Sequence, residues 1–410
     1  MTATRRLRIC YAVPGSDLVS SMGPTRNVLN LARALGRHAD VTVAFRRVAD
    51  PQWPEGIRVV EIEPAAASVR TDDAATAGIG YFDFLAYLKR LRRFAASDLA
   101  GFDVVLEKSW LLSGYLSALC TARGQLGVPV ENIVQNARYA ARQQWTKWLR
   151  MRVGAVVAGR CMRKAPLVIA ETEFLRQEIH DHWGVPLERI AVVHLGVDRT
   201  LFRPIDQAHA RRTLGLSQDA TILTYVGVLD WTHNLAPVMQ AMERVATPGL
   251  ELQVVGDGAR RGEYEAIAAN LGGRVRFHGK VPHGEVPLHI AAADLCLAPY
   301  ESAAFASGEL GYSTMKIPEY LGVGRAVASV PSGRIRSLID DRRNGFLFPN
   351  EKSNWCDFLS ALPSREALAV MGAAATAVEL PSWETTAEAY YRLCTRARDR
   401  QGWRGGRTSP

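Results

Sequence analysis

Short runs of β-branched and other apolar residues alternate with helical stretches along most of this chain. The first two runs cover 7–13 and 39–45, and the segment between them, TRNVLNLARAL, places apolar residues at helical spacing. A helix with one apolar face packs well on a sheet. Nearly continuous apolar strands joined by such helices are typical of parallel sheets covered on both faces. The sequence therefore predicts an α/β fold.

The predicted strands fall into two groups, which a proline-containing stretch at 202–205 separates. The first group covers 7–13, 39–45, 57–62, 102–108, 130–136, 166–171 and 190–196. The second covers 221–227, 250–256, 275–281, 294–300, 325–330 and 345–349. Since 410 residues suffice for two large domains, we expect two doubly wound Rossmann-like domains, at 1–200 and 205–380, facing each other across a cleft. We expect a helix at 381–395 and a basic, disordered tail at 396–410.

The net charge of +9 belongs to the N-terminal half and the tail. Residues 1–200 hold 27 basic and 19 acidic side chains, whereas residues 201–395 hold 18 and 21. A basic domain could meet nucleic acid, an anionic membrane surface or an acidic substrate. Neither zinc-finger spacing nor the aromatic signature of an RNA-binding sheet occurs, so we expect no nucleic-acid partner.

Six cysteines lie far apart without a C-x2-C pair, which predicts reduced thiols and neither a disulfide framework nor a zinc site. The sequence has no run of about 18 uncharged apolar residues, and its N-terminus enters a strand pattern without a signal-peptide core. We therefore expect a cytoplasmic protein, with peripheral contact at the inner face of a membrane as a further hypothesis.

Glycines follow the predicted strands of the second domain, where doubly wound sheets bind ligands. Gly227 ends one strand, Gly256 with Asp257 ends the next and Gly279 interrupts a third, and together they outline a rim for a phosphate-bearing ligand. In the first domain, a small-residue loop at 14–25 contains Gly15, Ser21 and Gly23. It matches neither G-x-G-x-x-G nor a P-loop, and a plain βα turn explains it as well.

The loop 300–313 leads into the predicted helix TMKIPEYLGVG, on which Lys316 and Glu319 lie three residues apart. Ser313 is a candidate N-cap for this helix. A cation beside the N-terminal amides suits a diphosphate, and a carboxylate one turn later suits a ribose diol. From spacing alone, an exposed ion pair between the two side chains is the alternative.

Several phrases in fixed order resemble the GT-B glycosyltransferases of family four, over nearly the whole chain. They are TRNVLNLARALGRHADVTVAF (25–45), VVHLGVDRTLFRP (192–204), YVGVLDWTHN (225–234), STMKIPEYLGVGRAVASV (313–330) and NGFLFP (344–349). The resemblance implies transfer of a sugar from a nucleotide-diphosphate sugar to an acceptor hydroxyl, with retention of anomeric configuration. It implies no metal and no other cofactor. It also implies that the helix 382–394 returns to the first domain.

The same resemblance assigns roles to individual residues. Glu319 takes the place of the ribose-binding glutamate and Lys316 lies by the diphosphate, so these two are the candidate catalytic residues. The residues expected to bind the donor are Gly227, Asn234, Gly256, Asp257, Gly279, Lys280, Val281, Glu309, Gly311, Tyr312, Ser313 and Thr314. The loop with Gly15, Ser21 and Gly23 is expected on the acceptor side.

The sequence departs from the family pattern in three places. Gly311 stands where many members carry the first glutamate of an E-x7-E pair, and Glu309 is the nearest acid. Val228 and His233 stand where many members carry an arginine and a lysine. The first-domain histidine is missing, and four residues are alternatives for its place: Glu107, Lys108, Glu131 and Asn136. These departures leave two other functions open, a non-catalytic nucleotide-sugar-binding protein and a GT-B epimerase.

Two basic segments of the first domain, 81–94 and 142–164, combine Lys and Arg with apolar or aromatic residues. The first segment fits an interfacial helix, and it also fits a core-facing helix with a solvated basic face. The hypothesis is that this domain, which receives the acceptor in the GT-B fold, approaches an anionic membrane or an acidic saccharide.

Overall fold

The structure is a computed structural model that describes residues 5–19, 23–49, 53, 56–63, 81–132, 145–245, 247–305, 308–400 and 402. It divides into two compact units. The N-terminal unit comprises Met1–Gly196, Gly311–Ser313 and Pro381–Pro410, and the C-terminal unit comprises Val197–Leu310 and Thr314–Leu380. Each unit is built on one parallel sheet, so the predicted α/β class is confirmed.

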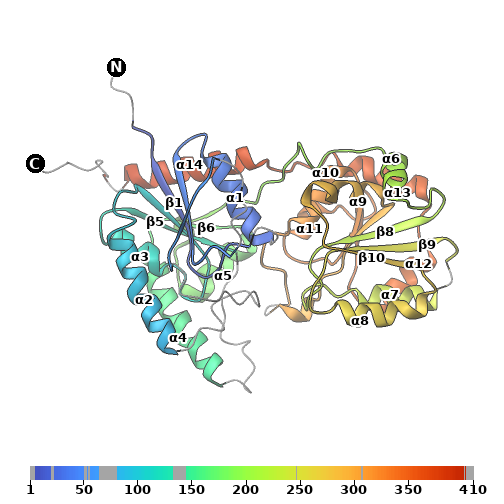
Figure 1. The fold of residues 1–410 in the computed structure, drawn as a ribbon, viewed down its shortest axis with the longest axis horizontal. Helices are drawn as coiled ribbons and strands as arrows, with labels where there is room; N and C mark the ends of the chain where they lie inside the picture. The colour runs from blue at the N-terminus through green and yellow to red at the C-terminus, as the bar shows by residue number, and fades with distance from the viewer. Residues whose placement is uncertain are drawn as a thin grey trace, which may run out of the picture. The chain divides into compact units, whose positions relative to one another are not determined.

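The N-terminal unit contains, in its described residues, a seven-stranded parallel sheet of order β3-β2-β1-β4-β5-β6-β7. The strands are β1 (Arg8–Val13), β2 (Asp40–Phe45), β3 (Arg58–Glu61), β4 (Val104–Lys108), β5 (Leu126–Glu131), β6 (Val168–Ala170) and β7 (Ile190–Val192). The helices are α1 (Gly23–Leu35), α2 (Tyr81–Ala96), α3 (Tyr115–Thr121), α4 (Trp145–Met162), α5 (Glu173–Trp183) and α14 (Trp383–Arg400). Helices α1 and α14 cover one face of the sheet, and α2 to α5 cover the other (Figure 1).

The C-terminal unit has a six-stranded parallel sheet of order β10-β9-β8-β11-β12-β13 in the described part of the chain. Its strands are β8 (Thr221–Val226), β9 (Leu250–Val255), β10 (Val275–Gly279), β11 (Leu295–Ala298), β12 (Ala326–Ser329) and β13 (Gly345–Leu347). Its helices are α6 (Gln207–Thr213), α7 (Ala236–Arg244), α8 (Arg261–Ala268), α9 (Val286–Ala292), α10 (Lys316–Val323), α11 (Ile335–Leu338), α12 (Lys352–Ser360) and α13 (Arg365–Ala375). In both sheets the strand order reverses once, between β1 and β4 and between β8 and β11.

The fifth strand differs from the prediction. It covers Leu126–Glu131, whereas the sequence predicted a strand at 130–136. Gly127 and Pro129 weakened the strand pattern, but both fit this place. A Cβ on Gly127 would lie 2.1 Å from the Ser117 carbonyl oxygen, so the glycine allows α3 to pack closely on β5. Pro129 pairs with Glu107 of β4 inside the parallel ladder.

The last helix is longer than predicted. Helix α14 continues to Arg400, so residues 396–400 are helical and the predicted disordered tail is wrong for them. The helix packs on α1 and β5 of the N-terminal unit. It also meets the end of β7, where Thr386 Oγ1 donates to the His194 carbonyl at 3.0 Å. Gly196 is required there, because a Cβ would lie 2.6 Å from the Trp383 nitrogen.

A buried ion pair holds α6 against the sheet of the C-terminal unit. Arg211 Nη2 donates to Asp294 Oδ2 at 2.7 Å, and the two side chains are 1% and 3% exposed. The same carboxylate oxygen accepts from the Ile222 amide of β8 at 2.7 Å. The other oxygen accepts from Gln207 at 3.0 Å. Removal of the carboxylate would therefore leave a buried guanidinium without its counter-charge.

We expect Asp294→Ala to lower the free energy of unfolding of the C-terminal unit by about 3 to 5 kcal/mol, the usual cost of removing one partner of a buried ion pair. Urea denaturation followed by tryptophan fluorescence measures this loss. Asp219→Ala, which removes an exposed acid from the same unit, serves as the control and should change stability by less than about 0.5 kcal/mol. Equal stability of the two variants would contradict the structural role of Asp294.

Candidate active site

The candidate site lies in the C-terminal unit at the carboxyl ends of β8, β9 and β10. Three glycines succeed one another there, as predicted. The Gly256 amide donates to the Gly279 carbonyl at 2.7 Å, and the Gly227 amide donates to the Val255 carbonyl at 2.9 Å. A Cβ on Gly256 would lie 1.9 Å from the Gly227 oxygen. The backbones of Gly227 and Gly256 pass each other this closely only because Gly256 lacks a side chain, and all three glycines have a positive φ. They lie beside the reversal of strand order between β8 and β11.

Lys316 begins α10 and reaches this edge of the sheet. Its Nζ lies 4.3 Å from the ring centroid of Tyr225 and 5.4 Å from that of Tyr300. It donates a hydrogen bond to Tyr225 Oη at 3.2 Å. A Cβ on Gly227 would lie 2.7 Å from Nζ. Burial lowers the pKa of Lys316 to about 7, and the carboxylates of Asp230 and Glu319 only partly oppose this shift.

His233 lies in the same aromatic cluster and is held by Asp230. Its Nδ1 lies 2.8 Å from Asp230 Oδ1, and its ring centroid lies 5.0 Å from that of Tyr300. Burial, together with the nearby Lys316, lowers the pKa of His233 to about 4. Burial alone would raise the pKa of Asp230, but hydrogen bonds from His233 and Thr232 outweigh it and lower that pKa. The pair is therefore a neutral imidazole bound to a carboxylate.

Glu319 lies one turn into α10 and is 9% exposed. Lys316 is also partly buried. The alternative of an exposed ion pair therefore does not describe these side chains. Ser313 is not the N-cap, since α10 begins at Lys316 and Met315 precedes it without a side-chain cap. Pro318 fits the first turn of the helix, where its missing N–H is not needed.

Asn234 and Asp257 contact other protein groups. Asn234 Nδ2 donates to Glu301 Oε2 at 2.9 Å, and its Oδ1 accepts from Arg260 Nη1 at 3.3 Å. Asp257 Oδ1 accepts from the Gly258 amide at 2.8 Å. Asn234 therefore ties the loop after β8 to the loop after β11, and Asp257 closes its own turn. Both shape the edge at which the donor is expected.

Glu309 is held by a different set of groups. Its carboxylate accepts two hydrogen bonds from Arg336 at 2.9 and 3.0 Å, one from Ser332 Oγ at 2.9 Å and one from the Gly333 amide at 2.7 Å. The bonds from Arg336 contribute most to lowering the pKa of Glu309. In this structure Glu309 anchors the loop before α10 to the segment before α11.

The remaining predicted residues lie in several places. Thr314 is buried and its hydroxyl is bonded to that of Tyr300. Gly311, Tyr312 and Ser313 belong to the N-terminal unit, where Thr172 Oγ1 donates to the Gly311 carbonyl at 2.7 Å. The turn after β10 carries Lys280, which is exposed, and Val281.

The predicted acceptor-side loop follows β1 in the N-terminal unit. A Cβ on Gly15 would lie 2.6 Å from Trp110 Cβ, which places this turn beside the loop that follows β4. Gly23 begins α1, and Ser21 lies outside the described residues. The turn thus lies where the strand order of the N-terminal sheet reverses.

The structure distinguishes the four alternatives for the missing histidine. Glu107 accepts from Trp110 Nε1 at 2.6 Å and from the Ser117 amide at 2.7 Å, so it anchors α3. Lys108 is paired with Glu171 at 2.6 Å in the interior. Glu131 is fully buried, its Oε1 has no partner in the structure, and burial raises its pKa to about 8. Asn136 lies outside the described residues.

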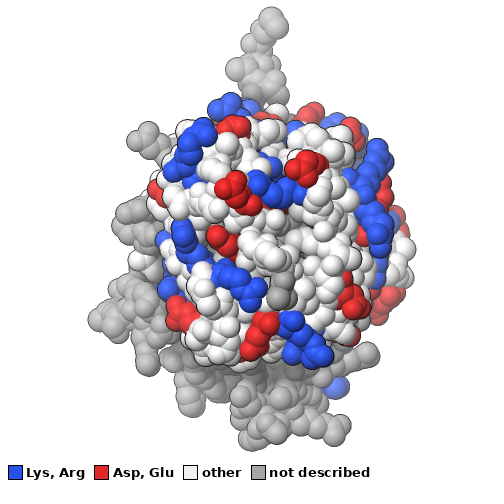
Figure 2. Space-filling view, turned by 90° about the vertical axis from the view of Figure 1, so that its right-hand side faces the viewer, with Lys and Arg blue, Asp and Glu red and all other residues white. Residues whose placement is uncertain are grey.

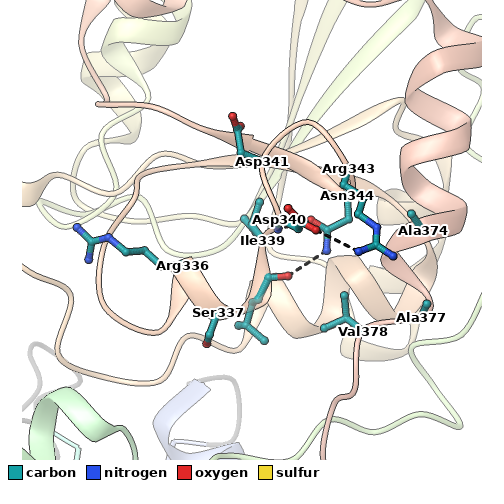
Figure 3. Close-up of a pocket in the computed structure, with 11 residues that line it drawn as sticks. Arg336, Ser337, Ile339, Asp340, Asp341, Arg343, Asn344, Ala374, Ala377 and Val378 are labelled. Atoms are coloured by element: carbon teal, nitrogen blue, oxygen red, sulfur yellow. Dashed lines mark hydrogen bonds and ion pairs between the residues drawn. The ribbon is translucent and has the colours of Figure 1, made fainter.

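A separate pocket of about 530 Å³ opens in the C-terminal unit between α11, the turn before β13 and the end of α13. Figure 3 shows Arg336, Asp340, Arg343 and Asn344 around it. Arg343 pairs with Asp340 at 3.3 Å, and Asn344 Nδ2 donates to the Leu338 carbonyl at 3.1 Å. Lys316, Glu319 and the three rim glycines do not line this pocket.

The sequence analysis missed Tyr225, Tyr300 and the Asp230–His233 hydrogen bond as the surroundings of Lys316. Tyr225 and Lys316 lie 91 residues apart, so no local pattern connects them. The sequence signal that could have identified the two tyrosines is their position near the ends of the two strands between which the strand order reverses.

Comparison with known protein families gives a match in each half of the chain. Residues 220–362 match the family described as "Glycosyl transferases group 1", and residues 22–196 match the "Glycosyl transferase 4-like domain". The chain belongs to the group 1 glycosyltransferases. The resemblance inferred from its sequence is thereby confirmed, and so is its glycosyltransferase activity as a class.

Curated relatives of this glycosyltransferase include D-inositol 3-phosphate glycosyltransferases. That of Geodermatophilus obscurus is 26% identical over 404 residues, which cover 93% of this chain and 86% of the relative. That of Mycobacterium avium is 29% identical over 324 residues, which cover 75% and 72%. The chain thus shares most of its length with enzymes of this name.

Solved structures share the GT-B fold. HepE of Anabaena in complex with UDP and glucose aligns with a TM-score of 0.72 at 16% identity, over 95% of this chain and 99% of that one. Sucrose-phosphate synthase of Thermosynechococcus elongatus aligns with a TM-score of 0.74 at 21% identity, over 96% and 100%. The two-domain α/β fold of the GT-B type is therefore confirmed.

Among the described residues, no cluster of three or more His, Cys, Asp or Glu side chains could hold a metal ion. Within the same ranges, no helix combines the length and apolar character needed to cross a bilayer.

Proposed function

We propose that this glycosyltransferase moves a sugar from a nucleotide-diphosphate sugar to an acceptor hydroxyl, with retention of anomeric configuration and without a metal. The observation that carries the proposal is the position of Lys316 at the start of α10, with its Nζ beside Gly227, and of Glu319 three residues later on the same helix. Lys316 would contact the diphosphate and Glu319 the ribose hydroxyls. The names of the curated relatives support a polyol or sugar phosphate as one class of acceptor to test.

The chemistry follows from where charge develops. As the bond from the anomeric carbon to the diphosphate oxygen breaks, negative charge grows on the diphosphate. Fixed dipoles and a cation placed at that point stabilise the transition state. The amides at the start of α10 and the ammonium group of Lys316 meet this requirement. In the proposed front-face reaction, the acceptor oxygen bonds to the face of the anomeric carbon from which the diphosphate departs. The proton of the acceptor hydroxyl passes to a diphosphate oxygen.

Incubation with labelled nucleotide sugars and candidate acceptors tests this function. We expect release of nucleoside diphosphate that depends on the acceptor, a product with the donor's anomeric configuration, and undiminished activity in EDTA. An isomeric nucleotide sugar would instead identify an epimerase, and binding without turnover a non-catalytic protein. Loss of activity in EDTA that added Mg²⁺ or Mn²⁺ restores would contradict the metal-free mechanism.

Two substitutions on α10 should act differently. Glu319→Ala should weaken nucleoside diphosphate binding by about 1.5 to 3 kcal/mol, because a charge-assisted hydrogen bond is lost. Lys316→Ala should reduce kcat more than affinity, since its charge matters most once the leaving group forms. Calorimetry and steady-state kinetics measure both effects, and Glu379→Ala, which removes an exposed acid, is the control. If both variants lose only affinity, and equally, then Lys316 binds the donor without aiding departure of the diphosphate.

We further propose that the N-terminal unit contacts an anionic membrane surface. Its helix α2 is core-facing, since Leu91 and Phe94 pack into the unit. Helix α4 differs, because Leu149, Val153 and Val156 are 47%, 55% and 52% exposed at helical spacing. Exposed basic residues of the same helix, Arg152 and Arg160 among them, flank this stripe. An apolar stripe bordered by cations is the pattern of a helix that lies in a membrane interface.

A liposome flotation assay at low salt tests this contact. We expect the protein to float with vesicles of phosphatidylcholine and phosphatidylglycerol but not with phosphatidylcholine alone. Replacing Leu149, Val153 and Val156 with Ser should abolish flotation, whereas Val370→Ser, at an exposed apolar position of the other unit, should not. Absence of flotation would leave a soluble acceptor as the partner of this enzyme.

The face of the molecule in Figure 2 carries Lys and Arg interspersed with Asp and Glu.

A further inference from the structure

Lys316 occupies an unusual place for a cation that should hold a diphosphate. Its ammonium group lies against two aromatic rings and donates to a phenol oxygen. No ion pair of 4.0 Å or less connects it to a carboxylate in the described part of the chain. Other cations of the same unit differ, since Arg260 pairs with Glu263 and Arg336 pairs with Glu309. Before a ligand arrives, the charge of Lys316 is therefore poorly compensated.

His233 is a second basic group at the same edge, and its geometry fixes one of its nitrogens. Asp230 Oδ1 is bonded to Nδ1 at 2.8 Å, which favours the tautomer with the proton on Nδ1. The remaining nitrogen, Nε2, is then the atom that can take up another proton. Thr232 holds Asp230 in place through its amide at 2.9 Å and its hydroxyl at 2.7 Å. The carboxylate is thus positioned to stabilise an imidazolium once a negative ligand is near.

Burial favours the neutral amine of Lys316 and the neutral imidazole of His233 in the absence of ligand. Tyr225 contacts Lys316 from β8, and burial raises the pKa of its phenol, so it supplies no negative charge. Tyr300 packs from the loop after β11. The carboxylates of Asp230 and Glu319 are the acidic groups whose attraction acts on Lys316. They do not offset its burial.

We propose that the donor diphosphate binds with uptake of protons by Lys316 and His233. This inference rests on the proposed function. The diphosphate brings two negative charges to the carboxyl end of β8, where Lys316 forms no ion pair among the described residues and Asp230 already holds His233. The chain has Val228 and His233, an uncharged side chain and an imidazole, after this strand. The affinity of the protein for the donor therefore depends on pH.

Isothermal titration in two buffers of equal pH but different ionisation enthalpy counts the protons taken up. The probes are UDP-glucose, ADP-glucose and GDP-mannose, whose diphosphate diesters do not titrate between pH 6 and 9. Since burial lowers the pKa of Lys316 to about 7, we expect Lys316 to contribute about half a proton at pH 7 and nearly one at pH 8, and uptake by His233 adds to these values. The dissociation constant should rise about tenfold between pH 7.5 and 8.5.

Variants separate this inference from a structural role of the same residues. Lys316→Arg keeps a permanent charge, so it should bind the donor with much less proton uptake and a flatter pH profile. His233→Gln should remove the uptake that persists below pH 7, and His209→Gln, at an exposed position of α6, should change nothing. Binding without proton uptake in the unmodified protein would overturn this inference alone. Failure of all three nucleotide sugars to bind would overturn the proposed function together with it.

Discussion

The close passage of backbone at the ends of β8, β9 and β10 is the constraint on which the candidate site depends. When helices cover both faces of a parallel sheet, ligands can bind at the ends of the strands. In the C-terminal unit the strand order reverses between β8 and β11, and the carboxyl ends of these strands are such a place. Gly227, Gly256 and Gly279 keep that edge of the sheet clear of side chains. Lys316 can therefore reach from α10 to the end of β8, and the amides of α10 point to the same place. A Cβ at Gly256 would clash with the Gly227 carbonyl, and one at Gly227 would clash with the Lys316 ammonium group.

The sequence was sufficient to predict the fold and much of the site, because both rest on short-range patterns. Strand alternation, strand-end glycines and the Lys316–Glu319 spacing are all local. The predictions that failed concern segments whose own residues argue against the structure that they adopt, because distant contacts stabilise it. Gly127 and Pro129 argue against a strand until α3 is known to lie against it. Residues 396–400 have the composition of a tail, yet they continue a helix.

What the sequence could not predict is how acidic and basic side chains divide their roles. Glu107 and Glu131 lie near the ends of neighbouring strands, but hydrogen bonds from α3 hold one, while the other retains an unpartnered oxygen. Helices α2 and α4 are both basic and partly apolar, yet among their described side chains several large apolar ones are exposed in α4 and only Leu85 in α2. In each pair, partners far away in the sequence decide the outcome.

The path of the chain has a consequence for synthesis of the protein. Helix α14 follows the C-terminal unit in the chain, yet it packs on α1 and β5 of the N-terminal unit. The ribosome must therefore make the whole C-terminal unit before α14 can join α1 on its face of the N-terminal sheet. Until then the part of that face that α14 covers is exposed apolar surface, a hazard for aggregation. The N-terminal unit is thus begun first and completed last. A chain truncated after residue 380 would contain a C-terminal unit attached to an N-terminal unit that lacks α14.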